Sequence, residues 1–241
     1  MEITLTELEA LRANLAPYIN ASGIVTIEAG APASPGDGNG LMQTGLMYCI
    51  LAQFAPLSKV DLDRVDLLGE ACLSSKVPLL YRSPFKKNPD DDNNHDDYRG
   101  WLAACYHVGS AYPKAFLAYA EAHGWYIDVQ QPEQERLKYL FSRFIEFPAF
   151  ARACAGAKAK LLDGLFLSLA ILWGAAFDVS KSDSCIKEYC LITVARKSST
   201  LARLASRVWF WRVRRRYGIT GQAFAAYFKS RVHPLCVGDW P

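Results

Sequence analysis

Apolar side chains recur at three- and four-residue intervals along most of this chain, which is the spacing that places them on one face of a helix. Leu8, Leu11 and Leu15 follow this spacing, and a threonine with a glutamate three residues later forms a capping-box pattern ahead of them. A first helix should therefore begin near residue 4 and end near Pro17. We expect further helices at about residues 41–55, 60–74, 97–110, 113–123, 133–146, 148–157, 160–177, 182–196, 198–217 and 220–230.

Prolines and small polar residues mark where these helices begin. Pro113, Pro132 and Pro148 lie where the first turn of a helix accepts proline. An aspartate is expected to cap the helix at 60–74, and Asp96 or Asp97 is expected to N-cap the helix that starts at residue 97.

Two longer segments are predicted to be loops. Residues 20–40 are rich in glycine and proline, and residues 82–96 are strongly charged. Only residues 24–27 and 126–130 have an extended pattern. The sequence therefore predicts an all-α fold, a single domain over residues 1–241 with about ten helices, arranged as an α-hairpin array or as an incomplete α/α toroid.

The most apolar segment is residues 164–177, which lies between Asp163 and Asp178. It is shorter than the ~20 residues that a helix needs to cross a bilayer. We therefore expect a core helix, with 160–177 as the most buried element of the fold. The first residues have neither the basic start nor the apolar centre of a secretory signal, so neither a signal peptide nor a membrane span is expected.

Composition is that of a globular protein, with 51% hydrophobic and 21% charged residues. The net charge of +3 is too small to indicate nucleic-acid binding. The seven cysteines are an odd number, and no CxxC pair is present. We expect buried free thiols in a reducing compartment rather than disulfides or a zinc site.

The densest polar segment, residues 81–98, is the first candidate for chemistry. Asp90, Asp92, Asn94 and Asp96 have the alternating spacing of a calcium-binding loop. However, His95 occupies the position that needs glycine, and the terminal glutamate is replaced by a tryptophan. We therefore interpret the segment as a solvated loop and expect neither a metal nor a cofactor.

A second interpretation of the same region is an enzyme that cleaves glycans, either a polysaccharide lyase or a glycoside hydrolase on a toroid-like fold. Two carboxylates can divide the roles of acid and base when their environments separate their pKa values. Asp96 or Asp97 would take these roles, with Arg82, Tyr98 and His107 as substrate contacts.

The strongest charge pattern lies near the C-terminus, where residues 196–216 contain eight basic residues and no acidic one. A helical wheel places four large apolar residues on a stripe that we expect to face the core: Leu201, Leu204, Val208 and Trp211. Arg203, Arg207 and Arg214 align beside this stripe, and we expect them to contact an acidic protein partner. Nucleic acid is not the expected partner.

Short motifs spread along most of the chain resemble uncharacterised, mainly helical proteins of tailed bacteriophages. The matching pieces are Gly38-Asn39-Gly40-Leu41, Arg82-Ser83-Pro84, His95-Asp96-Asp97-Tyr98, Arg143 with Pro148, Asp183, and Tyr227-Phe228 followed by His233-Pro234. The resemblance implies a phage-encoded, virion-associated product, made in the host cytoplasm and assembled with other virion proteins. It assigns no catalytic residue. A non-enzymatic structural or adaptor protein is thus the leading interpretation, with the glycan-cleaving enzyme as the alternative.

Overall fold

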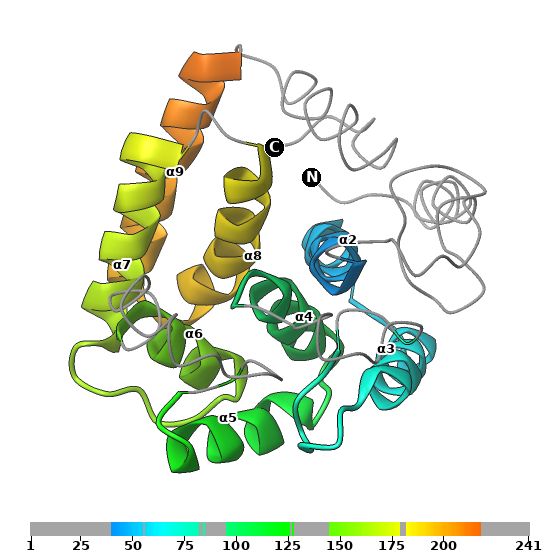
Figure 1. Cartoon of the computed structure of the whole chain (residues 1–241). Coiled ribbons are helices and arrows are strands. Elements are labelled where there is room, and N and C mark those ends of the chain that lie inside the picture. The colour runs from blue at the N-terminus through cyan, green and yellow to red at the C-terminus, as the bar shows by residue number, and fades with distance from the viewer. Residues whose placement is uncertain are drawn as a thin grey trace.

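The computed structural model describes residues 40–54, 56–81, 84, 95–125, 127, 145–178 and 182–217. These residues form α-helices and no β-strand, which confirms the predicted all-α class (Figure 1). The helices are α2 (Gly40–Phe54), α3 (Lys59–Cys72), α4 (His95–Val108), α5 (Tyr112–Ala122), α6 (Phe147–Cys154), α7 (Asp163–Trp173), α8 (Ser182–Ser198) and α9 (Thr200–Tyr217), and the π-helix η4 (Gly174–Asp178) continues α7. The helices predicted at the two termini, most of the one at 133–146 and most of the two predicted loops lie outside the described residues.

Helix starts follow the prolines more closely than the predicted aspartate caps. Proline occupies the first turn of α5 and of α6, as expected. The cap of α3 is Ser58 rather than an aspartate: the Asp61 amide donates to Ser58 Oγ at 3.4 Å, and the Ser58 amide donates to the Asp61 carboxylate at 2.8 Å. Helix α4 begins at His95, so Asp97 lies within its first turn and is not the N-cap.

Helix α4 is the centre of the fold and packs against α2, α3, α5, α6 and α8 (Figure 1). Its crossing with α2 is unusually close, because both helices have a glycine at the contact. A methyl group added at Gly45 would overlap the backbone of Gly100, and one added at Gly100 would lie 2.5 Å from the Cα atom of Met42. The two backbones are therefore in direct contact.

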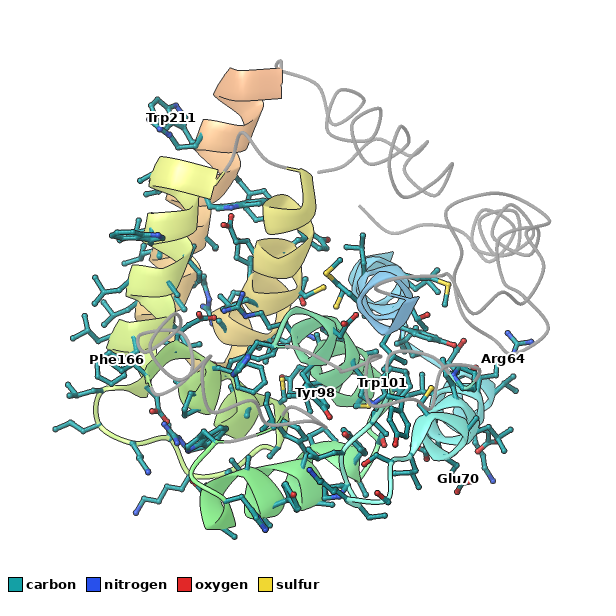
Figure 2. The ribbon with its side chains drawn as sticks, viewed as in Figure 1. Arg64, Glu70, Tyr98, Trp101, Phe166 and Trp211 are labelled. Carbon is teal, nitrogen blue, oxygen red and sulfur yellow. The ribbon has the colours of Figure 1, made fainter. Side chains whose placement is uncertain are left out.

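Aromatic side chains fill the space below this crossing. Tyr98 and Trp101 lie in the interior on α4 (Figure 2), and the Tyr98 ring lies 4.7 Å from that of Phe116. The Tyr98 hydroxyl accepts a hydrogen bond from the Leu80 amide at 2.9 Å, so the phenol is satisfied although it is buried. Phe147, on the adjoining helix α6, packs edge-on against Phe116.

The prediction that residues 160–177 form the most buried element is wrong. Helix α7 buries Leu167 and Ile171 on one face, whereas its opposite face is open to solvent. In α6, by contrast, almost every side chain is buried. Helix α7 is therefore apolar on two faces, and only one of these faces packs against the core.

Candidate docking surface on helices α7 and α9

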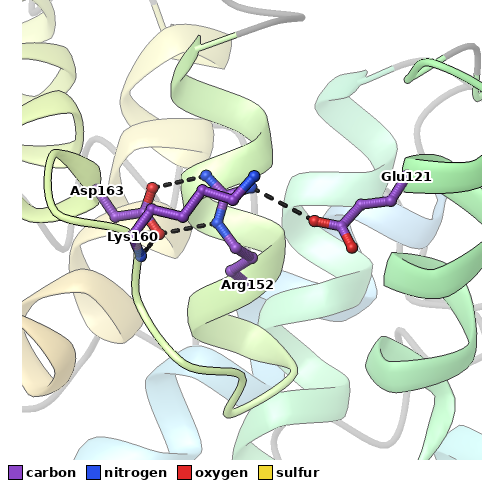
Figure 3. Close-up of polar contacts among 4 residues, drawn as sticks. All are labelled: Glu121, Arg152, Lys160 and Asp163. Atoms are coloured by element: carbon purple, nitrogen blue, oxygen red, sulfur yellow. Dashed lines mark hydrogen bonds and ion pairs between the residues drawn. The ribbon is translucent and has the colours of Figure 1, made fainter.

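An ion pair fixes the position where α7 begins. Arg152 on α6 donates to both carboxylate oxygens of Asp163, at 2.8 and 2.6 Å, and the Lys160 amide donates to the same carboxylate at 2.8 Å (Figure 3). Arg152 also lies 3.7 Å from the more exposed carboxylate of Glu121. Burial raises the pKa of Asp163, but the bonds from Arg152 and Lys160 outweigh burial and lower that pKa below its ordinary value.

Helices α7 and α9 are in contact along their length and run in the same direction. At their first turns, a methyl group at Gly164 would lie 2.7 Å from the Ser199 hydroxyl. At their far ends, Arg212 Nε donates to the Ala175 carbonyl at 3.1 Å. The close contact of Gly164 with Ser199 at one end and the hydrogen bond of Arg212 at the other hold the two helices side by side.

The face of α9 that enters the core is lined mainly by small residues, apart from one tryptophan. Ala202, Ala205 and Ser206 are buried, and Trp209 is buried with its Nε1 donating to the Glu188 carboxylate. The predicted core stripe is therefore wrong, because it lies on the neighbouring face. Helices α7 and α8 cover the face with the small residues and Trp209, and the four large apolar residues of the neighbouring face remain exposed.

The outward apolar residues of the two parallel helices form one surface. The α7–α9 surface consists of Leu165, Leu169, Leu172 and Trp173 on α7 with Leu201, Leu204, Val208 and Trp211 on α9, each between 38% and 63% exposed. Leu161 and Leu162 extend it before α7, with Leu161 98% exposed. Figure 2 shows Trp211 projecting from the outer side of α9.

Few exposed large hydrophobic residues lie elsewhere among the side chains that the structure describes. They are Val60, Leu67 and Val77. Scattered exposed apolar residues are ordinary on a protein surface, whereas a contiguous set marks an interaction site. The signal was present in the sequence, since residues 164–177 are apolar all round, but the pattern alone does not say which face is covered.

Basic side chains border the surface along α9. Arg203 and Arg207, two of the predicted partner contacts, are exposed there, and Lys158 and Lys160 are exposed next to Leu161. The third predicted contact, Arg214, belongs to α9, but its side chain lies outside the described part of the chain.

The residues proposed for glycan cleavage do not form a cluster in the described part of the structure. Asp97 and Tyr98 are buried in the interior. His107 lies two and a half helical turns from Tyr98, on the opposite side of α4, where its Nε2 pairs with Thr193 Oγ1 at 3.1 Å. Arg82 and the Asp96 side chain lie outside the described residues.

His107 belongs to a buried thiol cluster between α2, α4 and α8. Burial raises the pKa of Cys49, but hydrogen bonds with Cys190 and His107 outweigh burial and lower that pKa to about 5. The bond with Cys49, followed by burial, raises the pKa of Cys190 well above its ordinary range. Both thiols are fully buried, so a polymeric substrate cannot reach them.

The predicted buried thiols are confirmed for the cysteines whose side chains the structure describes. Five of them are buried and take part in no disulfide: Cys49, Cys72, Cys105, Cys154 and Cys190. No group of three or more metal-ligating side chains occurs in the described ranges. Of the calcium-loop candidates, Asp90, Asp92, Asn94 and the side chain of Asp96 lie outside those ranges.

Comparison with known proteins adds no relative to this picture. No protein-family model, no curated protein and no solved structure matches the chain. Among the described helices, none combines the length and the apolar character that a bilayer span requires.

Proposed function

We propose that this chain is a non-enzymatic structural or adaptor protein that docks to a partner through the α7–α9 surface. One observation carries the proposal: eight of the 13 exposed large hydrophobic side chains that the structure describes lie on two adjacent parallel helices, and two more lie directly before α7. Removing apolar area from water contributes about 25 cal/mol per Å², so covering this surface provides a driving force for association.

We further propose that the partner belongs to the virion of a tailed bacteriophage. The support is the resemblance of the short motifs along the chain to helical phage proteins. An adaptor in such a particle needs a rigid scaffold with a contact face. The α4-centred helices provide the scaffold, and the α7–α9 surface provides the face.

The first prediction tests this role by changing the surface without changing the core. Leu204→Glu places a charge in the middle of the outer row of α9, where a partner would have to bury it. We expect the variant to fold but to be lost from purified particles, as measured by mass spectrometry of virions from infected cells.

The matched control is Leu67→Glu, which makes the same change at an exposed leucine of α3, away from the surface. It should be incorporated into particles like the unchanged chain, and both variants should keep the helical far-UV circular dichroism spectrum. Equal incorporation of both variants would contradict docking through the α7–α9 surface. Absence of the unchanged chain from particles, despite good expression, would reject the virion role.

A further inference from the structure

The α7–α9 surface has two properties that together specify the chemistry of a partner. Its centre consists of two parallel apolar rows. The row on α7 has leucines at positions i, i+4 and i+7, and the row on α9 has apolar residues at i, i+3, i+7 and i+10. Its border carries basic side chains, with Arg203 and Arg207 along α9 and Lys158 and Lys160 before α7.

The two parallel rows have the spacing that allows a third helix to pack against both of them. Helices pack by placing the side-chain ridge of one between the ridges of its neighbours, with axes about 8–10 Å apart. The rows extend over two to three turns, which matches the i, i+3, i+4 and i+7 anchors of a short amphipathic helix. Two parallel helices can hold such an element without a change in their own packing.

The charge distribution defines the margin of that helix. Arg203 and Arg207 are exposed along α9, and Lys158 and Lys160 lie beside the start of α7. Two acidic side chains that the structure describes near the surface are engaged within the fold, since Asp163 is buried against Arg152 and Glu188 accepts from Trp209. Residues 189–238 contain no acidic residue.

A second copy of the same surface does not fit this charge pattern. Two copies placed face to face would bring basic borders together, and like charges across an interface oppose association. A bilayer fits less well than a helix, because only α9 carries arginines beside its apolar row, whereas α7 carries no charged side chain between Gly164 and Trp173. Helices that lie in an anionic membrane interface are rich in lysine and arginine on the face beside the apolar one.

We infer that the α7–α9 surface binds an amphipathic helix of another protein, with leucine or aromatic residues on one face and carboxylates along one margin that meet Arg203 and Arg207. This inference rests on the proposed docking role and names the class of partner. Arginine suits this task because its planar fork can donate two parallel hydrogen bonds to one carboxylate.

The test uses the full chain and two synthetic probes. Both are 18-residue helical peptides with the same leucine face; one has glutamate along one margin of that face, and the other has lysine at those positions. Fluorescence anisotropy should show that the glutamate peptide binds and the lysine peptide binds at least about tenfold more weakly. The affinity of the glutamate peptide should fall as salt is raised.

Variants of the chain test the apolar contact and the charge contact separately. Leu204→Glu should abolish binding of both peptides. The double variant Arg203→Glu with Arg207→Glu should lower the affinity for the glutamate peptide by about threefold to tenfold and raise the affinity for the lysine peptide. Lys76→Glu, an exposed charge reversal near the end of α3, should change neither affinity.

Several outcomes would overturn the inference. If the two peptides bind equally and the arginine reversals change nothing, the acidic partner is wrong, although loss of Leu204→Glu from particles would still support docking. Self-association that Leu204→Glu removes in sedimentation velocity would assign the surface to a second copy. Tighter binding to vesicles containing phosphatidylserine than to either peptide would assign it to a membrane.

Discussion

At the scale of single residues, the Arg152–Asp163 pair connects the aromatic core to the α7–α9 surface. Arg152 belongs to α6, whereas Asp163 is the first residue of α7, so the pair joins two helices in the interior. Removing one member of a buried pair leaves the other charge uncompensated, which costs about 3–5 kcal/mol. The pair therefore determines where α7 starts.

Asp163→Asn should lower the free energy of unfolding by about 3–5 kcal/mol in urea denaturation at neutral pH. Glu121→Gln is the matched control, because this carboxylate lies farther from Arg152 and is half-exposed. It should cost less than about 1 kcal/mol. Equal losses for the two variants would show that burial of the Asp163 pair has no special importance.

The same pair predicts a pH dependence. The pKa of Asp163 is lower in the folded chain than its ordinary value of 3.8. The ionised Asp163 carboxylate therefore contributes fully to the free energy of unfolding above about pH 5. This contribution is lost as the pH falls below about 4 toward the lowered pKa. The stability of the unchanged chain should fall more steeply over this acidic range than that of Asp163→Asn, and parallel curves would contradict the assignment.

At the scale of helices, the contact between α2 and α4 depends on two glycines rather than on large apolar side chains. Gly45→Ala and Gly100→Ala should each destabilise the chain by at least about 2 kcal/mol, because the backbones must move apart. Gly69→Ala is the control, since its methyl group would meet only the Trp101 ring, at 3.2 Å. It should change stability by less than about 1 kcal/mol in thermal denaturation. Tolerance of alanine at both crossing positions would disprove the close contact.

Helices could be located from the sequence more reliably than the faces they bury. Pro113 and Pro148 marked the starts of α5 and α6, because proline is disfavoured in the interior of a helix but accepted in its first turn. For α9, the wheel placed Leu204 and Val208 in the core because burial usually favours large apolar residues. The structure buries Ala202, Ala205 and Trp209 instead, because the neighbouring helices cover that face of α9.

The candidate site was likewise predictable in part: its charged residues could be identified from the sequence, but the exposed face of its helices could not. Arg203 and Arg207 were identified as partner contacts from their charge, and both are exposed beside the α7–α9 surface. The apolar centre of that surface was predicted to be core, because inward and outward rows on one helix have the same period. Only the positions of neighbouring helices distinguish the two rows.

At the scale of the whole molecule, α8 connects two groups of helices. It packs against α2, α4 and α6 as well as against α7 and α9. A chain that unfolds as a single domain should therefore expose its buried cysteines together. Buried cysteines of α2, α3, α4 and α6 report on one group of helices, and Cys190 reports on the connecting helix α8.

Thiol labelling during urea denaturation tests this cooperativity. Two of the seven cysteines, Cys185 and Cys236, have side chains that the structure does not describe. They are first replaced, as Cys185→Ser and Cys236→Ser, so that only the five buried thiols remain. These should react slowly with a disulfide reagent under native conditions and then become reactive in one transition that coincides with the loss of helix. Two separate labelling transitions would contradict the single-domain prediction.

The two apolar faces of α9 should also respond differently to random mutation. A library selected only for folding should reject larger residues at Ala202 and Ala205, which have no space to accommodate them, and accept many residues at Leu204 and Val208. A library selected for assembly should restrict the second pair as well. The inner face can change only with its own neighbouring helices, whereas the outer face is free to change in step with another gene product.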